Sequence, residues 1–115
     1  MSIVKELSGN SPASGLADGI DQMTAGFVTA SIAAAASGTD ELQIKGKLNI
    51  SLSGTWSATV TLQRSFDRGT TWLDVQNWTA NAEAVDEESE ENVLYRIWCK
   101  TGDYTSGTAV ARLSR

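Results

Sequence analysis

The sequence contains no histidine and only one cysteine, Cys99, and each shortage removes a class of chemistry. Without histidine, the chain lacks the usual general base of Ser-His-Asp and Cys-His enzymes and the commonest zinc ligand. A single cysteine cannot form an internal disulfide. Because Cys99 lies in an apolar run over residues 93–99, we interpret it as a small buried hydrophobic residue rather than a nucleophile.

Basic residues are also scarce, and long apolar runs are missing. Nine Lys and Arg against 14 Asp and Glu give a net charge of −5. Such a balance argues against a nucleic-acid partner, because phosphate binding needs clustered cations. No segment reaches the ~18 apolar residues of a membrane helix, and the N-terminus lacks the basic-then-apolar pattern of a signal peptide. We therefore expect a soluble protein, made in a reducing cytoplasm, that binds neither nucleic acid nor membrane.

What the chain does contain divides into two parts. Residues 1–26 are rich in Ser, Gly, Ala and Asp and predict an extended N-terminal arm. Residues 27–115 have the length and apolar content of one folded domain. The arm either has no role of its own or orders against a neighbouring subunit. In the second case its apolar side chains are the candidate interface: Ile3, Val4, Leu7, Leu16, Ile20 and Met23.

Period-two alternation of apolar and polar residues is the main structural signal. It is clearest over residues 40–53, where large apolar residues occupy the even positions: Leu42, Ile44, Leu48, Ile50 and Leu52. Gly46 interrupts this series and predicts a bulge or a close approach. Further strands are expected over residues 27–36, 56–64, 72–79, 93–100 and 108–113, with turns at 53–55 and 102–107. The pattern predicts an all-β fold, an antiparallel β-sandwich of jelly-roll or immunoglobulin-like topology.

One octapeptide, residues 65–72, reads S-F-D-R-G-T-T-W and connects two of these predicted strands. It resembles the Asp-box of sialidases and other propeller proteins. A carboxylate at Asp67 can accept backbone N–H bonds within its own loop, and Gly69 can adopt a positive φ. We interpret the motif as a structural hairpin, whose defining residues are Ser65, Asp67, Gly69, Thr71 and Trp72.

Other polar clusters give weaker signals for chemistry. Residues 86–91 carry five carboxylates but lack the spacing and the glycine of a calcium loop. We expect a solvated acidic loop, or else a docking patch for a basic partner. Asp67 and Asp74 could form a glycosidase pair only if Asp67 were free of its loop. We therefore expect no catalytic residue, no metal and no cofactor.

Four tryptophans leave a second interpretation open. Trp56 shares its parity with Val60, which favours a core position, and Trp72 belongs to the hairpin. Trp78 and Trp98 are less constrained. Core packing is the default for all four residues, and a sugar-stacking face is the alternative.

Two stretches together resemble a known family. Residues 49–72 read N-I-S-L-S-G-T-W-S-A-T-V-T-L-Q-R-S-F-D-R-G-T-T-W, and residues 93–114 contain L-Y-R-I-W-C and S-G-T-A-V-A-R-L-S. The combination is similar to small β-sandwich virion proteins of tailed bacteriophages, in which Gly more commonly stands at the position of Arg68. The resemblance covers about residues 40–115. It implies a structural protein of the virion, most simply a capsid decoration (cement) protein, and not an enzyme.

The same resemblance implies partners and location. A decoration protein made in the host cytoplasm would reside in the virion, bind the major capsid protein or other virion proteins through its arm and its sheet edges, and form a homo-oligomer. The alternatives are a tail or head–tail accessory protein and a carbohydrate-binding β-sandwich module, for which a glycan would be the partner.

Overall fold

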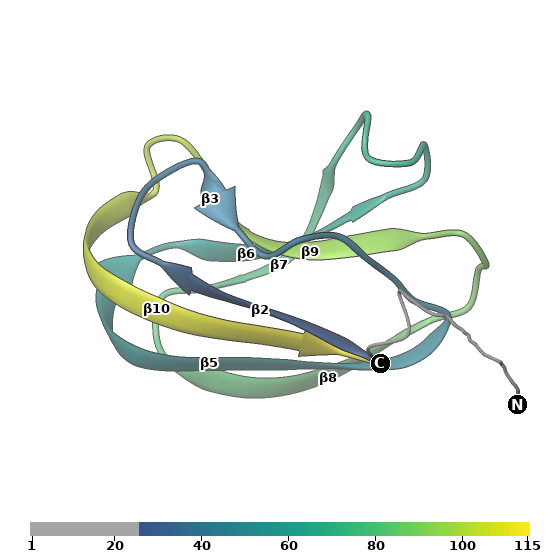
Figure 1. Cartoon of the computed structure of the whole chain (residues 1–115), viewed down its shortest axis with the longest axis horizontal. Coiled ribbons are helices and arrows are strands. Elements are labelled where there is room, and N and C mark those ends of the chain that lie inside the picture. Colours follow the sequence, from purple (N-terminus) through teal and green to yellow (C-terminus); the bar gives the residue numbers. More distant parts are fainter. Residues whose placement is uncertain (1–25) are drawn as a thin grey trace, which may run out of the picture.

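The computed structural model describes residues 26–115, and this part of the chain is built of strands without a helix (Figure 1). The strands are β2 (Phe27–Ile32), β3 (Ser37–Gly38), β4 (Leu42–Gln43), β5 (Gly46–Ala58), β6 (Val60–Ser65), β7 (Leu73–Trp78), β8 (Ala82–Glu88), β9 (Leu94–Cys99) and β10 (Tyr104–Ser114). The predicted arm, including the candidate interface residues Ile3, Val4, Leu7, Leu16, Ile20 and Met23, lies outside the described residues except for Gly26.

The strands form two antiparallel sheets that pack face to face. The first sheet has the order β2-β10-β5-β8, and the second has the order β3-β9-β6-β7, with β4 also paired to β9. The prediction of an all-β sandwich is therefore confirmed. Chain neighbours β5 and β6 belong to different sheets, so the chain crosses between the layers at Thr59.

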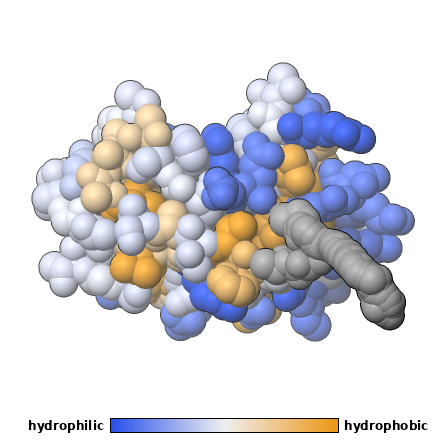
Figure 2. Space-filling view, viewed as in Figure 1, coloured by the Kyte–Doolittle hydropathy of each residue, from blue (hydrophilic) through white to orange (hydrophobic). Residues whose placement is uncertain are grey.

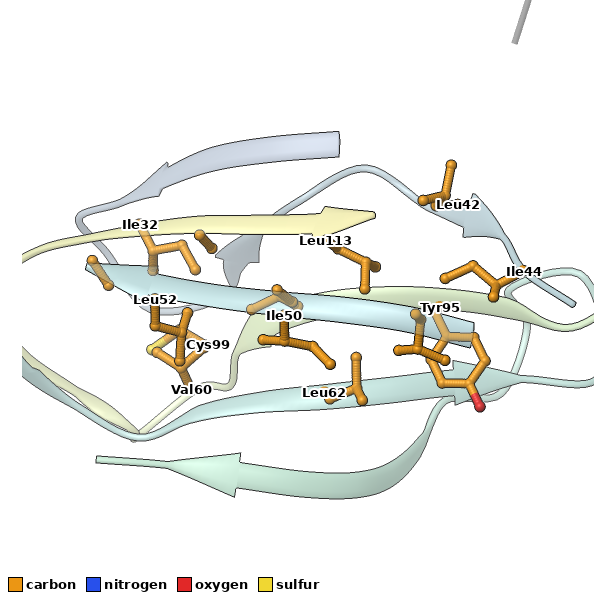
Figure 3. Close-up of a cluster of buried hydrophobic side chains, with 14 of the residues drawn as sticks. Ile32, Leu42, Ile44, Ile50, Leu52, Val60, Leu62, Tyr95, Cys99 and Leu113 are labelled. Atoms are coloured by element: carbon orange, nitrogen blue, oxygen red, sulfur yellow. The ribbon is translucent and has the colours of Figure 1, made fainter. Parts of the chain in front are cut away.

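The core fills the space between the two inner faces (Figure 3). Alternation along β9 directs Tyr95, Ile97 and Cys99 inward, and each is at most 1% exposed. They belong to one buried cluster with Ile50 and Leu52 of the opposite sheet, and Figure 3 shows Cys99 beside Leu52. Burial of each large aliphatic side chain contributes about 1.5–3 kcal/mol to folding.

Gly46 divides the strand that the alternation predicts over residues 40–53. Leu42 pairs with Tyr95 in the second sheet, whereas Leu48 pairs with Asp86 in the first. Gly46 has φ 95°, and a Cβ added there would meet nothing within 4 Å, so this glycine changes the direction of the chain rather than allowing a close approach. Both leucines are still buried, because their side chains belong to the core that the two sheets share.

The predicted turn at residues 53–55 is wrong. This segment continues β5, and Gly54 pairs with Ala109 of β10. A Cβ on Gly54 would lie 2.5 Å from the Thr108 carbonyl oxygen, so glycine is required for close approach of the two strands. Gly107, predicted as part of a turn, likewise lies within β10. Figure 1 shows β5 and β10 curving together at this end of the sandwich.

The acidic run over residues 86–91 is only partly the solvated loop that the sequence predicts. Residues Asp86, Glu87 and Glu88 belong to β8, an edge strand paired with β5. Glu88 is 4% exposed. The expectation of a loop is wrong for these three residues because they pair with residues 46–48 of β5.

Candidate functional site

The hairpin loop, residues 65–72, is held by hydrogen bonds among its own residues. The Asp67 carboxylate accepts the Thr71 N–H at 2.8 Å and the Ser65 hydroxyl at 2.7 Å. The Ser65 oxygen in turn accepts the N–H groups of Gly69 at 2.8 Å and Asp67 at 3.3 Å. The bonds from Thr71 and Ser65 lower the pKa of Asp67 to about 2. The carboxylate is therefore ionised and stabilises the loop by accepting hydrogen bonds from the loop's own donors.

Two consecutive residues of this loop adopt positive φ. Gly69 has φ 92°, which the sequence predicts, and Arg68 has φ 62°, which it does not. A left-handed conformation costs a non-glycine residue about 1–2 kcal/mol. The Trp72 indole lies against the loop, with its Cζ2 atom 3.6 Å from where a Gly69 Cβ would be.

Outside the second sheet, Arg96 lies between two tryptophans. Its guanidinium carbon is 4.2 Å from the Trp72 ring centroid and 3.9 Å from that of Trp98. Burial lowers the pKa of Arg96, while the charge of Glu41 acts in the opposite direction. The faces of both indoles that a sugar ring would use on this side are covered by the guanidinium.

A hydrogen-bonded chain extends from Arg96 across the same sheet. The Arg96 Nε–H donates to Gln63 Oε1 at 2.9 Å, and Gln63 Nε2 donates to Asp74 at 2.9 Å. Asp74 also binds Lys100 Nζ at 2.6 Å. The bonds from Gln63 and Lys100 lower the pKa of Asp74. The two carboxylates considered as a glycosidase pair, Asp67 and Asp74, thus each have separate structural partners.

Glu88 forms a second polar cluster, at the edge of the core. It accepts the Tyr95 hydroxyl at 2.6 Å and binds Arg64 Nη1 at 3.1 Å, and its other oxygen accepts the Glu90 N–H at 3.1 Å. Burial alone would raise the pKa of Glu88, but these bonds outweigh it and lower the pKa. Burial and the bond to Glu88 raise the pKa of Tyr95 to about 12. No local sequence pattern predicts this cluster, because its members come from three strands.

The other aromatic and thiol candidates are packed into the fold. Trp56 and Trp78 are half-buried against the core, and the Trp56 Nε1–H donates to Asn81 at 2.6 Å. Cys99 is fully buried in β9. Burial, followed by the charge of Asp103, raises the pKa of the Cys99 thiol. Because it is buried and its pKa is raised, the Cys99 thiol is expected to be unreactive in the folded chain.

Beside the hairpin loop lies a hollow of about 320 Å³. It is lined by Glu41, Gln43, Arg68, Asn92 and Leu94. The Gln43 Nε2 group donates to Asn92 Oδ1 at 3.0 Å, which fixes the two amides relative to each other. The sequence did not predict this site, because its residues come from separate segments of the chain.

No family model matches the chain, and neither the curated proteins nor the solved structures contain a significant match. Among residues 26–115, no group of three or more acidic or cysteine side chains is placed to hold a metal ion. No helix in the same residues is long and apolar enough to cross a membrane.

Proposed function

We propose that this protein is a structural component of a tailed-bacteriophage virion, a capsid decoration protein that binds the shell through its N-terminal arm and a sheet edge and performs no catalysis. The observation that carries the proposal is the hairpin loop. Asp67, the residue that would most resemble a catalytic carboxylate, is engaged by Ser65 and Thr71. The motif by which the chain resembles virion sandwich proteins therefore stabilises its own loop.

Among residues 26–115, β2 lies at one edge of the first sheet, and it supports the second half of the proposal. Its sequence, FVTASI, has neither a charge nor a proline, whereas the opposite edge of the sheet, β8, carries four carboxylates in AEAVDEE. Charged side chains on an edge discourage pairing with another chain, and uncharged edges permit it. The two edges of the first sheet thus differ in their capacity to accept a strand from a partner.

The direction of the β2 backbone groups follows from its register with β10. The Arg115 N–H donates to the Gly26 carbonyl at 2.8 Å, which makes this pair a hydrogen-bonded one. Because such pairs alternate along an antiparallel ladder, the N–H and C=O groups of Phe27, Thr29 and Ser31 point away from β10. These are the groups that would bind an added strand.

The experiment is to count the protein in purified particles by mass spectrometry, relative to the major shell protein. Hundreds of copies per particle are expected for a decoration protein, and a handful would instead place it in the tail or neck. Absence from particles would reject the proposal.

A binding assay with undecorated particles then tests the two contact elements. Deleting residues 1–24 and replacing Thr29→Pro should each weaken binding, because the proline removes an N–H that points outward from the edge. Glu87→Gln, on the opposite edge of the sheet, is the control. Full binding by both test variants would remove the arm and β2 from the mechanism.

A further inference from the structure

The hollow beside the hairpin loop has a composition that the structural role does not require. The hollow is lined by the acidic Glu41 and the basic Arg68, together with the Gln43–Asn92 amide pair and the half-buried Leu94. Figure 2 shows that the end of the molecule bearing the hairpin loop is strongly hydrophilic, in contrast to the paler opposite end.

Several polar side-chain groups that line this hollow have no hydrogen-bond partner among residues 26–115. Within residues 26–115, neither Glu41 nor Arg68 forms a hydrogen bond or an ion pair through its side chain. The bond between Gln43 and Asn92 leaves the Gln43 Oε1 acceptor and the Asn92 Nδ2 donor without a partner in the same part of the chain. Donors and acceptors therefore converge on one open volume.

Two of these residues have a positive φ, a backbone conformation that non-glycine residues seldom adopt. Only three non-glycine residues among those described have positive φ, and two of them, Arg68 at 62° and Asn92 at 64°, line this hollow. Asparagine tolerates the left-handed region, but arginine does not favour it. Arg68 is therefore the strained residue of this pair, and a strained residue at an open hollow is a sign of a functional constraint.

Gly69 also makes room for the site. A Cβ at this position would lie 2.8 Å from the Glu41 Oε2 atom. The absence of a side chain thus lets the Glu41 carboxylate lie directly against the loop. Its charge also acts on Arg96, which stacks on the Trp72 indole. The Glu41 carboxylate therefore lies beside the loop, and its oxygens remain available to a ligand.

We propose that this hollow binds a saccharide. An acidic and a basic residue in the lining of one hollow disfavour a ligand of either single charge, whereas vicinal hydroxyl groups can donate to Glu41 and accept from Arg68 at once. The side-chain amides add one more acceptor, Gln43 Oε1, and one more donor, Asn92 Nδ2, for sugar hydroxyl groups. Leu94 supplies an apolar surface for the C–H face of a sugar ring. This proposal goes beyond the structural role and does not depend on it.

The test is a titration of the isotopically labelled full chain, followed by NMR, with glucose, galactose, rhamnose and N-acetylglucosamine. Each sugar is added to about 50 mM, well above the Kd of order 1 mM expected for a shallow site. Shifts of the Glu41, Gln43, Asn92 and Leu94 amides with at least one sugar are expected. No shifts with any sugar, or shifts centred on Trp98 instead, would overturn the proposal.

Two variants test the assigned groups. Glu41→Gln keeps the size of the side chain and removes its charge, and Arg68→Gly removes the guanidinium while suiting the positive φ of the backbone. Each should weaken the affinity for the sugar about tenfold. Arg68→Gly is expected to fold at least as stably as the parent chain, so loss of binding cannot be attributed to unfolding. Glu87→Gln should bind as the parent does, and unchanged binding by both test variants would contradict the assignment.

Discussion

Two buried threonines differ by one hydrogen bond. The Thr39 hydroxyl oxygen accepts the Ile97 N–H at 3.0 Å, whereas Thr61 Oγ1 is buried without a partner among residues 26–115. Both side chains are at most 3% exposed. A buried polar group without a hydrogen-bond partner lowers the free energy of unfolding, whereas one with a partner raises it.

We therefore expect Thr61→Val to raise the free energy of unfolding by about 1 kcal/mol, because valine keeps the branched shape and removes the unpaired hydroxyl. Thr39→Val should lower the free energy of unfolding by about 1–2 kcal/mol, because it leaves the Ile97 N–H without its acceptor. Urea unfolding of both variants measures the difference. Equal effects of the two substitutions would show that the Thr61 hydroxyl has a partner in solution, such as water.

The Asp67 carboxylate predicts a pH dependence. Its pKa is about 2 in the folded chain against 3.8 for an unperturbed aspartate, so the unfolded state binds the proton more readily. The stability that Asp67 contributes is therefore complete above pH 3.8 and is lost as the pH falls toward about 2. Asp67→Asn should be less stable than the parent at neutral pH and should show a smaller loss between these two values. Thermal unfolding across this range tests it, and parallel profiles for the two chains would contradict the assignment.

The residue scale also shows what a sequence can reveal about a site. Asp67 and Gly69 could be assigned because their partners lie within four residues of them. The Glu88 cluster could not, because Arg64 lies 24 residues away and only the fold brings it there. The hollow was missed for the same reason, since Gln43 and Asn92 are 49 residues apart and only the pairing of β4 with β9 brings them together.

At the scale of elements, strand β5 depends on glycine in two distinct ways. Gly46 and Gly54 have nearly the same backbone angle, φ 95° and 98°. Around Gly46 there is open space, whereas Gly54 lies against the Thr108 carbonyl. Substituting each glycine by alanine would therefore separate two contributions to stability: the cost of a left-handed backbone at both positions, and the cost of a steric clash at Gly54 alone.

Gly46→Ala should lower the free energy of unfolding by about 1–2 kcal/mol, the cost of a left-handed alanine. Gly54→Ala should cost that amount and more, about 3 kcal/mol or above, because its Cβ also meets a backbone oxygen that cannot move without disturbing the ladder. Chemical unfolding of the two variants measures both. Equal losses would mean that the β10 backbone shifts readily at Thr108.

The elements that the sequence predicted well are those with an uninterrupted alternation. The inward positions of β9 and the buried leucines of β5 follow directly from period two. The turn expected at residues 53–55 was wrong because Ser, Gly and Thr are common in turns, and only the partner strand reveals that Gly54 packs against it. Strand β8 was missed because its carboxylates resemble a solvated loop, and burial of Glu88 requires Tyr95 and Arg64.

At the scale of the whole molecule, the buried hydrophobic residues of the described part run from Ile32 to Leu113 and connect both sheets. Removal of residues 1–24 should therefore leave a cooperatively folded sandwich, with a melting temperature within a few degrees of the full chain. Circular dichroism during heating measures this. A large loss of stability would show that the N-terminal segment contributes to folding as well as to the binding proposed for it.

Cys99 is a built-in probe for the rate at which the core opens. It is the chain's single thiol, and it lies in the core with no exposed surface. A thiol-specific dye can reach it only when β9 separates from its neighbours, so the labelling rate at saturating dye equals the rate of that opening. The same measurement on particles carrying the protein would test the proposed decoration role, because binding to a shell should lower the rate of opening.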